Sequence, residues 1–234
     1  MANLVFQVSI APKGRTWETA GKKVFRYSNY LYDFSNDRAE QYAEKVNADY
    51  FKLETMDWLG ENYAPCYHKL YIYELAKKYD RILYLDSDCV ITQFCPNIFE
   101  RENIVMAAPD QPNNPSGRKK LRQHKENHSL PDHLYFTTSV LHVNKEFCET
   151  TEKHWQNALR DIEFMQGSQH DQSLFNVLVA KHSSYKLLNP NWGAWYGKGH
   201  YIKHYYGPTN TSNWEPDAFL QWEKRLYERL EKQK

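Results

Sequence analysis

Residues 81–91 limit the fold of this chain more than any other stretch. They read RILYLDSDCVI, an apolar run that two aspartates, Asp86 and Asp88, interrupt. A nearly continuous apolar run is typical of a strand covered on both faces, as in the parallel sheets of α/β proteins. Two carboxylates beside such a strand are costly unless they meet a cation, an arginine cluster or solvent in a cleft. The segment therefore predicts an α/β fold with a polar site at the end of a buried strand.

Asp86 and Asp88 offer oxygen ligands of the kind that a hard divalent cation prefers. Mg²⁺ and Mn²⁺ take carboxylate oxygens, keep several waters and share their coordination shell with a substrate phosphate. An Asp-x-Asp triplet alone is weak support for such a site, because many such triplets lie in loops or at helix caps. The setting strengthens it here, because the preceding segment 67–79 has apolar residues at helical spacing and ends in a break at Tyr79-Asp80.

Length and composition narrow the class of protein. A chain of 234 residues suits one α/β domain and is too short for two ordinary ones, so we expect a single domain over 1–234. Its 30 basic and 29 acidic residues nearly balance, which argues against nucleic acid or an anionic membrane as an obligate partner. We find no secretory signal or transmembrane run, and the four cysteines lack CxxC and zinc spacing. We therefore expect a cytoplasmic protein with reduced thiols and no obligate membrane insertion.

Periodicity and turn residues predict the remaining elements. Strands are expected at residues 4–11, 49–53, 104–108 and 134–143, and helices at 38–46, 67–79, 152–165 and 216–234. Residues 35–37 are expected to cap the first of these helices. On the C-terminal helix, four residues are expected to face the core: Phe219, Leu220, Leu226 and Leu230. Residues 109–131 are rich in proline and basic residues and lack periodicity, which predicts a mobile binding loop.

Taken with the residues around it, the Asp-x-Asp segment resembles the nucleotide-sugar-dependent glycosyltransferases of the GT-A fold. It is most similar to family 8, the glycogenin and bacterial galactosyltransferase group. Four motifs carry the resemblance, in the family's order: a basic residue, Lys69, and a helix followed by YDRILYLDSD at 79–88; QHDQSLFNVL at 169–178; LLNPNW at 187–192; and YIKHYYGP at 201–208. The resemblance implies a Rossmann-like GT-A domain, with a mainly parallel, mixed central sheet flanked by helices.

The resemblance also implies a site. Asp86, Asp88 and His204 would hold Mn²⁺ or Mg²⁺, and Asp171 and Gln172 would be the catalytic residues. The donor would contact Ile10, Ala11, Lys69, Ser87 and Gly207, while Trp192 would lie on the acceptor side. The family retains anomeric configuration, and an amide such as that of Gln172 is too weakly basic to act as the nucleophile of a retaining glycosidase. Front-face attack by the acceptor hydroxyl is therefore the better expectation.

Two departures from the family pattern leave the donor open. FTTSV at 136–140 stands where the family has Phe-Asn-x-Gly-Val, so both the asparagine and the glycine are missing. Asn210 stands where the family commonly has a lysine that contacts the leaving diphosphate. Lys203 or the basic segment 118–125 could supply a replacement cation.

We therefore expect metal-dependent transfer of a sugar from a nucleotide-diphosphate sugar, a UDP-sugar, to a glycan or other hydroxyl acceptor. Two other classes stay open. A metal-dependent nucleotidyltransferase would also use paired aspartates, but it should have a glycine-rich phosphate loop, which this sequence lacks. A non-catalytic carbohydrate-binding protein would explain Trp192, Trp195 and the 18 tyrosines without using Asp86 or Asp88.

Overall fold

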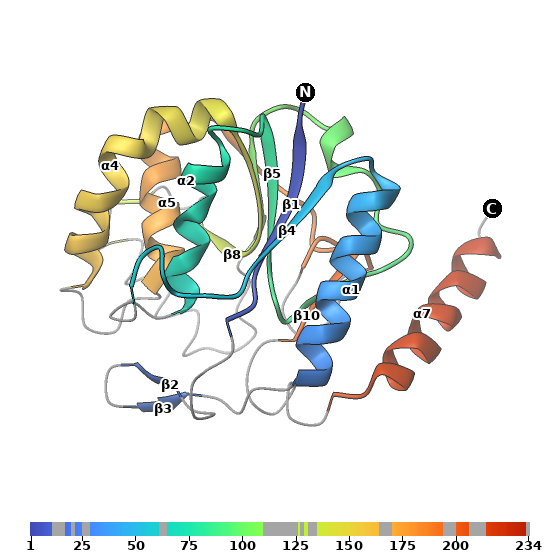
Figure 1. Ribbon diagram of the computed structural model, residues 1–234. Helices are drawn as coiled ribbons and strands as arrows, with labels where there is room; N and C mark the ends of the chain where they lie inside the picture. Colours follow the sequence, from blue (N-terminus) through green and yellow to red (C-terminus); the bar gives the residue numbers. More distant parts are fainter. Residues whose placement is uncertain are drawn as a thin grey trace.

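The computed structural model describes residues 1–10, 17–19, 22–24, 29–60, 65–109, 126, 129–130, 135–163, 170–193, 200–205 and 214–232. Its centre is a six-stranded sheet of order β4-β1-β5-β8-β7-β9 (Figure 1). The strands are β1 (Asn3–Val8), β4 (Asp49–Leu53), β5 (Arg81–Asp86), β7 (Val105–Pro109), β8 (Phe136–Asn144) and β9 (Tyr185–Leu187). Only β8 runs against its neighbours, β5 and β7, and the other neighbouring pairs are parallel. The predicted mainly parallel mixed sheet is confirmed.

Helices cover both faces of this sheet (Figure 1). On one face lie α2 (Ile72–Leu75), which follows a 3₁₀ segment (Pro65–Tyr71), α4 (Lys145–Glu163) and α5 (His170–His182). On the other face lies α1 (Asn29–Lys45), with α7 (Pro216–Glu231) beyond it. Two-stranded sheets are formed by β2 (Trp17–Thr19) with β3 (Lys22–Val24) and by β6 (Cys89–Ile91) with β10 (Ile202–His204).

The two helical layers explain why the central strands lack a hydrophobic alternation. Successive side chains of a strand point to opposite faces of the sheet. Along β5, Ile82 and Tyr84 belong to the core under α2, α4 and α5, whereas Leu83 and Leu85 belong to the core under α1. Both sets must be apolar, as expected for a strand buried on both faces. Asp86, the last residue of β5, is the first of this strand to be partly exposed.

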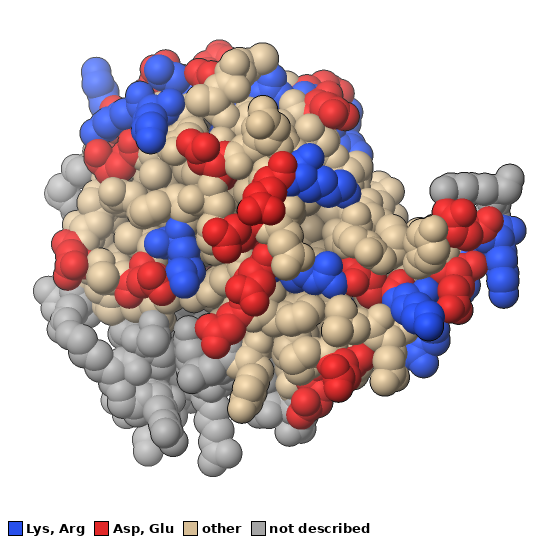
Figure 2. Space-filling view, turned by 45° about the vertical axis from the view of Figure 1, so that its right-hand side comes forward, with Lys and Arg blue, Asp and Glu red and all other residues tan. Residues whose placement is uncertain are grey.

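Helix α1 differs most from the sequence-based prediction. It begins at Asn29, so residues 35–37 lie inside the helix and do not cap it. Its inner face contains buried Ser35 and Asn36, whose side chains bond to the Cys89 carbonyl and to the Ser9 hydroxyl. Its exposed residues Asp33, Asp37, Glu40 and Glu44 follow one another at helical spacing. Figure 2 shows a band of acidic side chains across the face that α1 covers. The sequence-based prediction missed the start of α1 because Ser35 and Asn36, both buried, occupy positions where helical periodicity expects an apolar residue.

Other boundaries shift for local reasons. The helix predicted at 67–79 is a 3₁₀ segment over Pro65–Tyr71 followed by the short α2. Helix α4 starts at Lys145, earlier than predicted, because its first turn is fixed by the Asn144 side chain, which accepts from the backbone N–H of Phe147. On α7 the prediction for Leu220 is wrong: it is 43% exposed, whereas Phe219, Leu226 and the polar Glu223 are buried.

Three further predictions concern the cysteines, membrane-spanning helices and the loop at 109–131. All four cysteines are free thiols, as expected. Among the described helices, none has both the length and the apolar composition to cross a membrane. Most of the predicted loop 109–131 lies outside the described residues.

Candidate active site

The Asp86-Ser87-Asp88 turn connects the carboxyl end of β5 to β6. At this end β1 pairs with β5 through Val8 and Asp86, and β8 pairs with β5 up to Val140 and Leu85. Because β8 is antiparallel, its early residues lie beside the same end of β5. Ligands of open α/β sheets bind outside the carboxyl ends of the strands. The turn therefore lies where the fold favours a binding site.

Lys69, from the segment before α2, lies at the centre of the charged groups here. Its Nζ is 3.1 Å from Asp86 Oδ1 and 2.6 Å from Asp171 Oδ2. It also donates to Thr138 Oγ1 at 3.0 Å, and this hydroxyl donates to Asp171 Oδ2 at 2.6 Å. The Tyr84 hydroxyl donates to Asp86 Oδ1 at 2.6 Å, and its ring centre is 4.8 Å from the ammonium group. One cation thus joins a carboxylate of β5 to a carboxylate of α5.

Burial and charge act in opposite directions on these groups. Burial alone would lower the pKa of Lys69, whose side chain is 2% exposed, but Asp171 and Asp86 raise it above its ordinary value. The lysine therefore stays protonated. Burial raises the pKa of Asp86, while the attraction of Lys69 lowers it and the charges of Asp88 and Asp171 raise it further. The ionised form of Asp86 therefore depends on Lys69.

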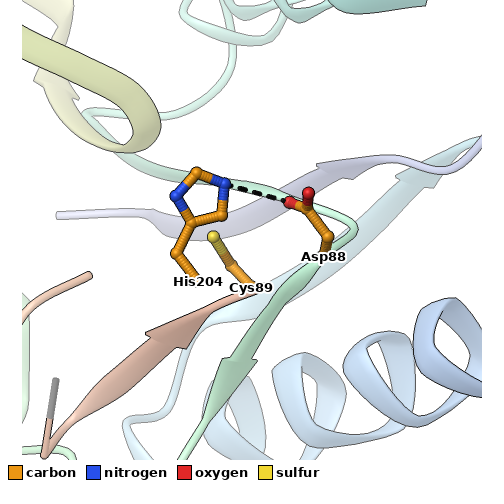
Figure 3. A group of neighbouring side chains, drawn as sticks. All are labelled: Asp88, Cys89 and His204. Atoms are coloured by element: carbon orange, nitrogen blue, oxygen red, sulfur yellow. Dashed lines mark ion pairs between the residues drawn. The ribbon is translucent and has the colours of Figure 1, made fainter. Parts of the chain in front are cut away.

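A second group of side chains gathers around Asp88. His204 lies opposite Cys89 in the antiparallel β6–β10 pair. Its Nε2 is 3.4 Å from Asp88 Oδ1, and Figure 3 shows the imidazole turned toward the carboxylate with the Cys89 sulfur beside it. Ligand atoms of these three residues lie within 4.8 Å of one another. Asp88 Oδ1 is buried and accepts no hydrogen bond from the described residues. A buried carboxylate oxygen paired with an imidazole fits the donor set of a divalent cation.

Asp88 and His204 each favour the charged form of the other. Burial raises the pKa of Asp88, but His204 more than offsets this, and the net pKa is below its ordinary value. In His204, burial lowers the pKa, and the carboxylates of Asp88 and Asp86 outweigh it, so the net pKa is raised. An imidazole must be neutral to bind a metal. Protons would therefore compete with a cation for the His204 imidazole.

Asn176 fixes the beginning of α5 against β8. Its side chain accepts from the backbone N–H of Phe136 and donates to the carbonyls of Phe136 and Gln172. These bonds hold Asp171 and Gln172 above the end of the sheet where Asp86 lies. The structure thus brings the Asp171 carboxylate to Lys69.

Of the five residues predicted to contact a donor, the structure describes three. Ser87 is half-buried within the turn, and Ile10 is buried just beyond the end of β1. Two carboxylates and a hydroxyl enclose the Lys69 ammonium. Its position therefore does not support the predicted contact with the donor diphosphate. The remaining candidates lie outside the described residues: Ala11, Gly207, Asn210 and the segment 118–125.

Two aromatic contacts correct the sequence-based interpretation. Trp192 is 0% exposed and packs edge-on against Tyr201 in the core under α1. A buried ring does not fit the predicted contact with an acceptor, so Trp192 is removed from the candidate site. The Lys203 ammonium lies 3.6 Å from the ring centre of Trp222 on α7. It therefore faces α7, on the opposite side of β10 from the buried His204, and is not placed as a replacement cation for a diphosphate.

Three residues of the site were missed by sequence reasoning: Tyr84, Cys89 and Thr138. Tyrosine and threonine in a strand are ordinary β-formers, and cysteine in an apolar run is an ordinary core residue. The signal that could have identified them was the position of each residue along its strand. Tyr84 and Asp86 lie two residues apart on one strand and so share a face. Thr138 lies within the motif that departs from the family pattern.

A family model supplies the identification. The model described as "Glycosyl transferase family 8" matches residues 16–212. The chain belongs to glycosyltransferase family 8. It is therefore an enzyme, a glycosyltransferase, and the resemblance inferred from the four motifs is confirmed. The match argues against both alternatives, the nucleotidyltransferase and the non-catalytic binding protein.

Solved structures agree on the fold. The galactosyltransferase LgtC, solved in complex with donor and acceptor sugar analogs, is similar with a TM-score of 0.61 at 14% identity, covering 95% of each chain. A glycosyltransferase involved in the glycosylation of the major capsid of PBCV-1 has a TM-score of 0.54 at 13% identity, covering 82% of each chain. GlyE of Streptococcus pneumoniae TIGR4 has a TM-score of 0.54 at 14% identity, covering 88% of this chain and 55% of its own. No curated protein matches this chain in sequence. The chain thus shares the GT-A fold with glycosyltransferases that differ widely from it in sequence.

Proposed function

We propose that this glycosyltransferase transfers a sugar from a UDP-sugar to a hydroxyl of a glycan acceptor, with Mn²⁺ or Mg²⁺ bound by Asp86, Asp88 and His204. The observation that carries the proposal is the meeting of β5, β6, β10 and α5 at one end of the sheet. They bring Asp86 and Asp171 to the buried Lys69 and set Asp88 beside His204, with Gln172 next to Asp171 in sequence. The LgtC complex with donor and acceptor sugar analogs supports this class of substrates. We further propose that residues 1–234 form one catalytic domain.

Each residue of this group has a distinct role in the proposal. A divalent ion at Asp88 and His204 would stabilise the negative charge that grows on the leaving diphosphate. Lys69 holds Asp86 and Asp171 in fixed positions, and Thr138 orients the Asp171 carboxylate through its 2.6 Å hydrogen bond. Gln172, next to Asp171, would contact the donor sugar. Its amide is a poor nucleophile, which favours retention by front-face attack of the acceptor hydroxyl.

The test is a panel of nucleotide sugars, each incubated with the protein and Mn²⁺. We expect slow hydrolysis of one donor, which stops when the metal is removed with a chelator and when Asp88 is replaced by asparagine. Hydrolysis that continues unchanged after chelation would contradict the metal-dependent mechanism. The donor that is hydrolysed would then be offered with candidate acceptors, which tests transfer directly.

Mn²⁺ binding should weaken as the pH falls. His204 must lose its proton to bind the ion, and Asp88 and Asp86 raise its pKa above the ordinary value of about 6.5. Since the raised pKa lets protons compete at a higher pH, the loss of affinity should begin above about pH 6.5. Titration of Mn²⁺ between about pH 5.5 and 8 measures this. A His204→Gln variant should lose most of the pH dependence, and an equally steep profile in that variant would assign the effect to another group.

Replacing Cys89 should lower the affinity for soft cations far more than the affinity for hard cations. Thiolates prefer soft ions, whereas Mn²⁺ and Mg²⁺ prefer oxygen and imidazole ligands. We therefore expect Cys89→Ser to change Mn²⁺ affinity by less than about twofold and to weaken Cd²⁺ binding by about tenfold or more. Calorimetric titration of both ions measures this, with the equally buried Cys148→Ser as the control. A large loss of Mn²⁺ affinity in Cys89→Ser alone would show that the thiol holds the physiological ion.

A further inference from the structure

A buried chain of hydrogen bonds reaches the Asp-x-Asp turn from the side of α1. The Ser35 hydroxyl donates to the backbone carbonyl of Cys89 at 2.6 Å. Gln7 Nε2 donates to Ser35 Oγ at 3.1 Å, and the Tyr50 hydroxyl donates to Gln7 Oε1 at 3.0 Å. The chain therefore crosses from β4 through β1 and α1 to the first residue of β6.

The polar groups in this chain are unusual for their place in the core. Gln7 and Ser35 are both 0% exposed, and the neighbours of Gln7 on β1 are Phe6 and Val8. Buried amides and hydroxyls are costly unless they are hydrogen-bonded, and apolar side chains would fill the same space without that requirement. Here each donor meets an acceptor in one direction, so that successive bonds reinforce one another. The reason for these buried polar groups should therefore lie in the backbone that the last bond holds, the one from Ser35 to the Cys89 carbonyl.

The last bond holds the backbone next to Asp88. The Asp88 carbonyl accepts from the backbone N–H of Tyr205 at 2.9 Å, on the β10 side. The next carbonyl, that of Cys89, accepts from Ser35, on the α1 side. Two consecutive carbonyls are thus fixed from two different elements. The first of them belongs to Asp88 itself, whose carboxylate lies 3.4 Å from His204 Nε2.

We propose that Ser35, supported by Gln7 and Tyr50, is a positioning residue for cation binding: it holds the Asp88–Cys89 backbone so that the Asp88 carboxylate faces His204. The inference rests on the proposed function, because it takes Asp88 and His204 as ligands of the ion. Ser35 itself touches neither the ion nor a substrate. Without its hydroxyl, the Cys89 carbonyl loses its buried donor, and the turn is free to rotate away from His204.

The test is a titration of Mn²⁺ into the protein without nucleotide, in which electron paramagnetic resonance measures the free ion. Hydrogen-bond partners of metal ligands typically change affinity about tenfold to 100-fold, and Ser35 acts one bond further away. We therefore expect Ser35→Ala to raise the Kd for Mn²⁺ roughly three- to tenfold. Gln7→Met and Tyr50→Phe should have smaller effects, in that order, because both leave the bond from Ser35 to Cys89 in place. Ser35→Thr, which keeps the hydroxyl, should restore most of the affinity.

Thr151 on α4 provides a matched control. It is also 0% exposed, its hydroxyl lies 2.9 Å from the Tyr73 hydroxyl, and it donates to the Phe147 carbonyl at 2.7 Å. This pair belongs to the opposite face of the sheet, away from the turn. Thr151→Ala should lower the free energy of unfolding in urea by a similar amount to Ser35→Ala, and it should leave the Kd for Mn²⁺ unchanged.

The outcomes separate this proposal from the proposed function. If Ser35→Ala binds Mn²⁺ as the unaltered protein does, the positioning role is overturned and the proposed metal site stands. If Thr151→Ala loses affinity equally, the effect is general loss of stability and the positioning role is again overturned. If the unaltered protein shows no saturable Mn²⁺ binding, both proposals fail. Should Ser35→Ala not fold, unchanged affinity in both Gln7→Met and Tyr50→Phe would count against the role.

Discussion

Replacing Asp88 with alanine is expected to abolish Mn²⁺-dependent nucleotide binding and to leave the fold intact. Asp88 Oδ1 is buried without a hydrogen bond from the described residues, and its nearest charged partner is His204. Removing this carboxylate removes a ligand of the proposed site, and the His204 imidazole can lose its proton once its partner is gone, so it is not left as an unpaired buried charge. The loss should exceed the tenfold to 100-fold that is typical for partners of ligands, so we expect more than about 100-fold. Calorimetric titration of a nucleoside diphosphate with Mn²⁺ measures it.

Three further variants serve as comparisons for Asp88→Ala. Asp37→Ala removes an exposed carboxylate of α1 and should bind as the unaltered protein does. His204→Ala should weaken binding less completely than Asp88→Ala, because water can take the place of the imidazole. Asp86→Ala should also abolish binding, but with a loss of stability, because Lys69 loses one of its two carboxylates. If the Asp88 variant binds nucleotide normally, the proposed metal site loses its main support.

The fold could be predicted from the sequence because its strongest signal is local. A strand buried on both faces must be apolar throughout, and residues 81–86 show this without reference to the rest of the chain. The strand at Asp49–Leu53 was also placed correctly. The start of α1 was not, because Ser35 and Asn36 have partners on β1 and at the start of β6 that are distant in the sequence. Periodicity counts apolar residues, and it cannot register a buried polar residue whose partner lies elsewhere.

The candidate site shows the same limit. Asp86, Asp88, Asp171 and His204 were named as candidates because four motifs occur in the family's order, and in the structure they lie at one end of the sheet. Thr138 and Tyr84 were not found, because their role depends on contacts with Lys69 and Asp86 across three elements. Trp192 was assigned to the acceptor side from its motif, although an aromatic residue serves equally well as a sugar platform or as core. Only burial separates these two roles, and burial is a property of the fold.

Lys69→Met should destabilise the protein more than any other single change considered for this site. The side chain is 2% exposed and joins Asp86 to Asp171, so its removal leaves the buried Asp171 carboxylate and the partly exposed Asp86 carboxylate without this cation. Breaking a buried ion pair by removing one partner typically costs about 3–5 kcal/mol. We expect a loss of this size in the free energy of unfolding, measured in urea near pH 7.5. Lys69→Arg keeps the charge and should retain most of the stability, although the larger guanidinium must fit an enclosed space.

The pH dependence distinguishes this electrostatic cause from a loss of packing. In the unaltered protein burial raises the pKa of Asp86 while Lys69 lowers it, so the pKa should rise further in Lys69→Met. A carboxyl group whose pKa is higher in the folded than in the unfolded state costs the most stability above its folded pKa. This cost shrinks as the pH falls through the folded value and is gone below the unfolded value of about 3.9. The deficit of Lys69→Met should therefore shrink on acidification. Adding Asp171→Asn, which removes one unpaired charge, should recover part of the stability at pH 7.5. A deficit that is independent of pH and unaffected by Asp171→Asn would mean that Lys69 contributes through packing alone.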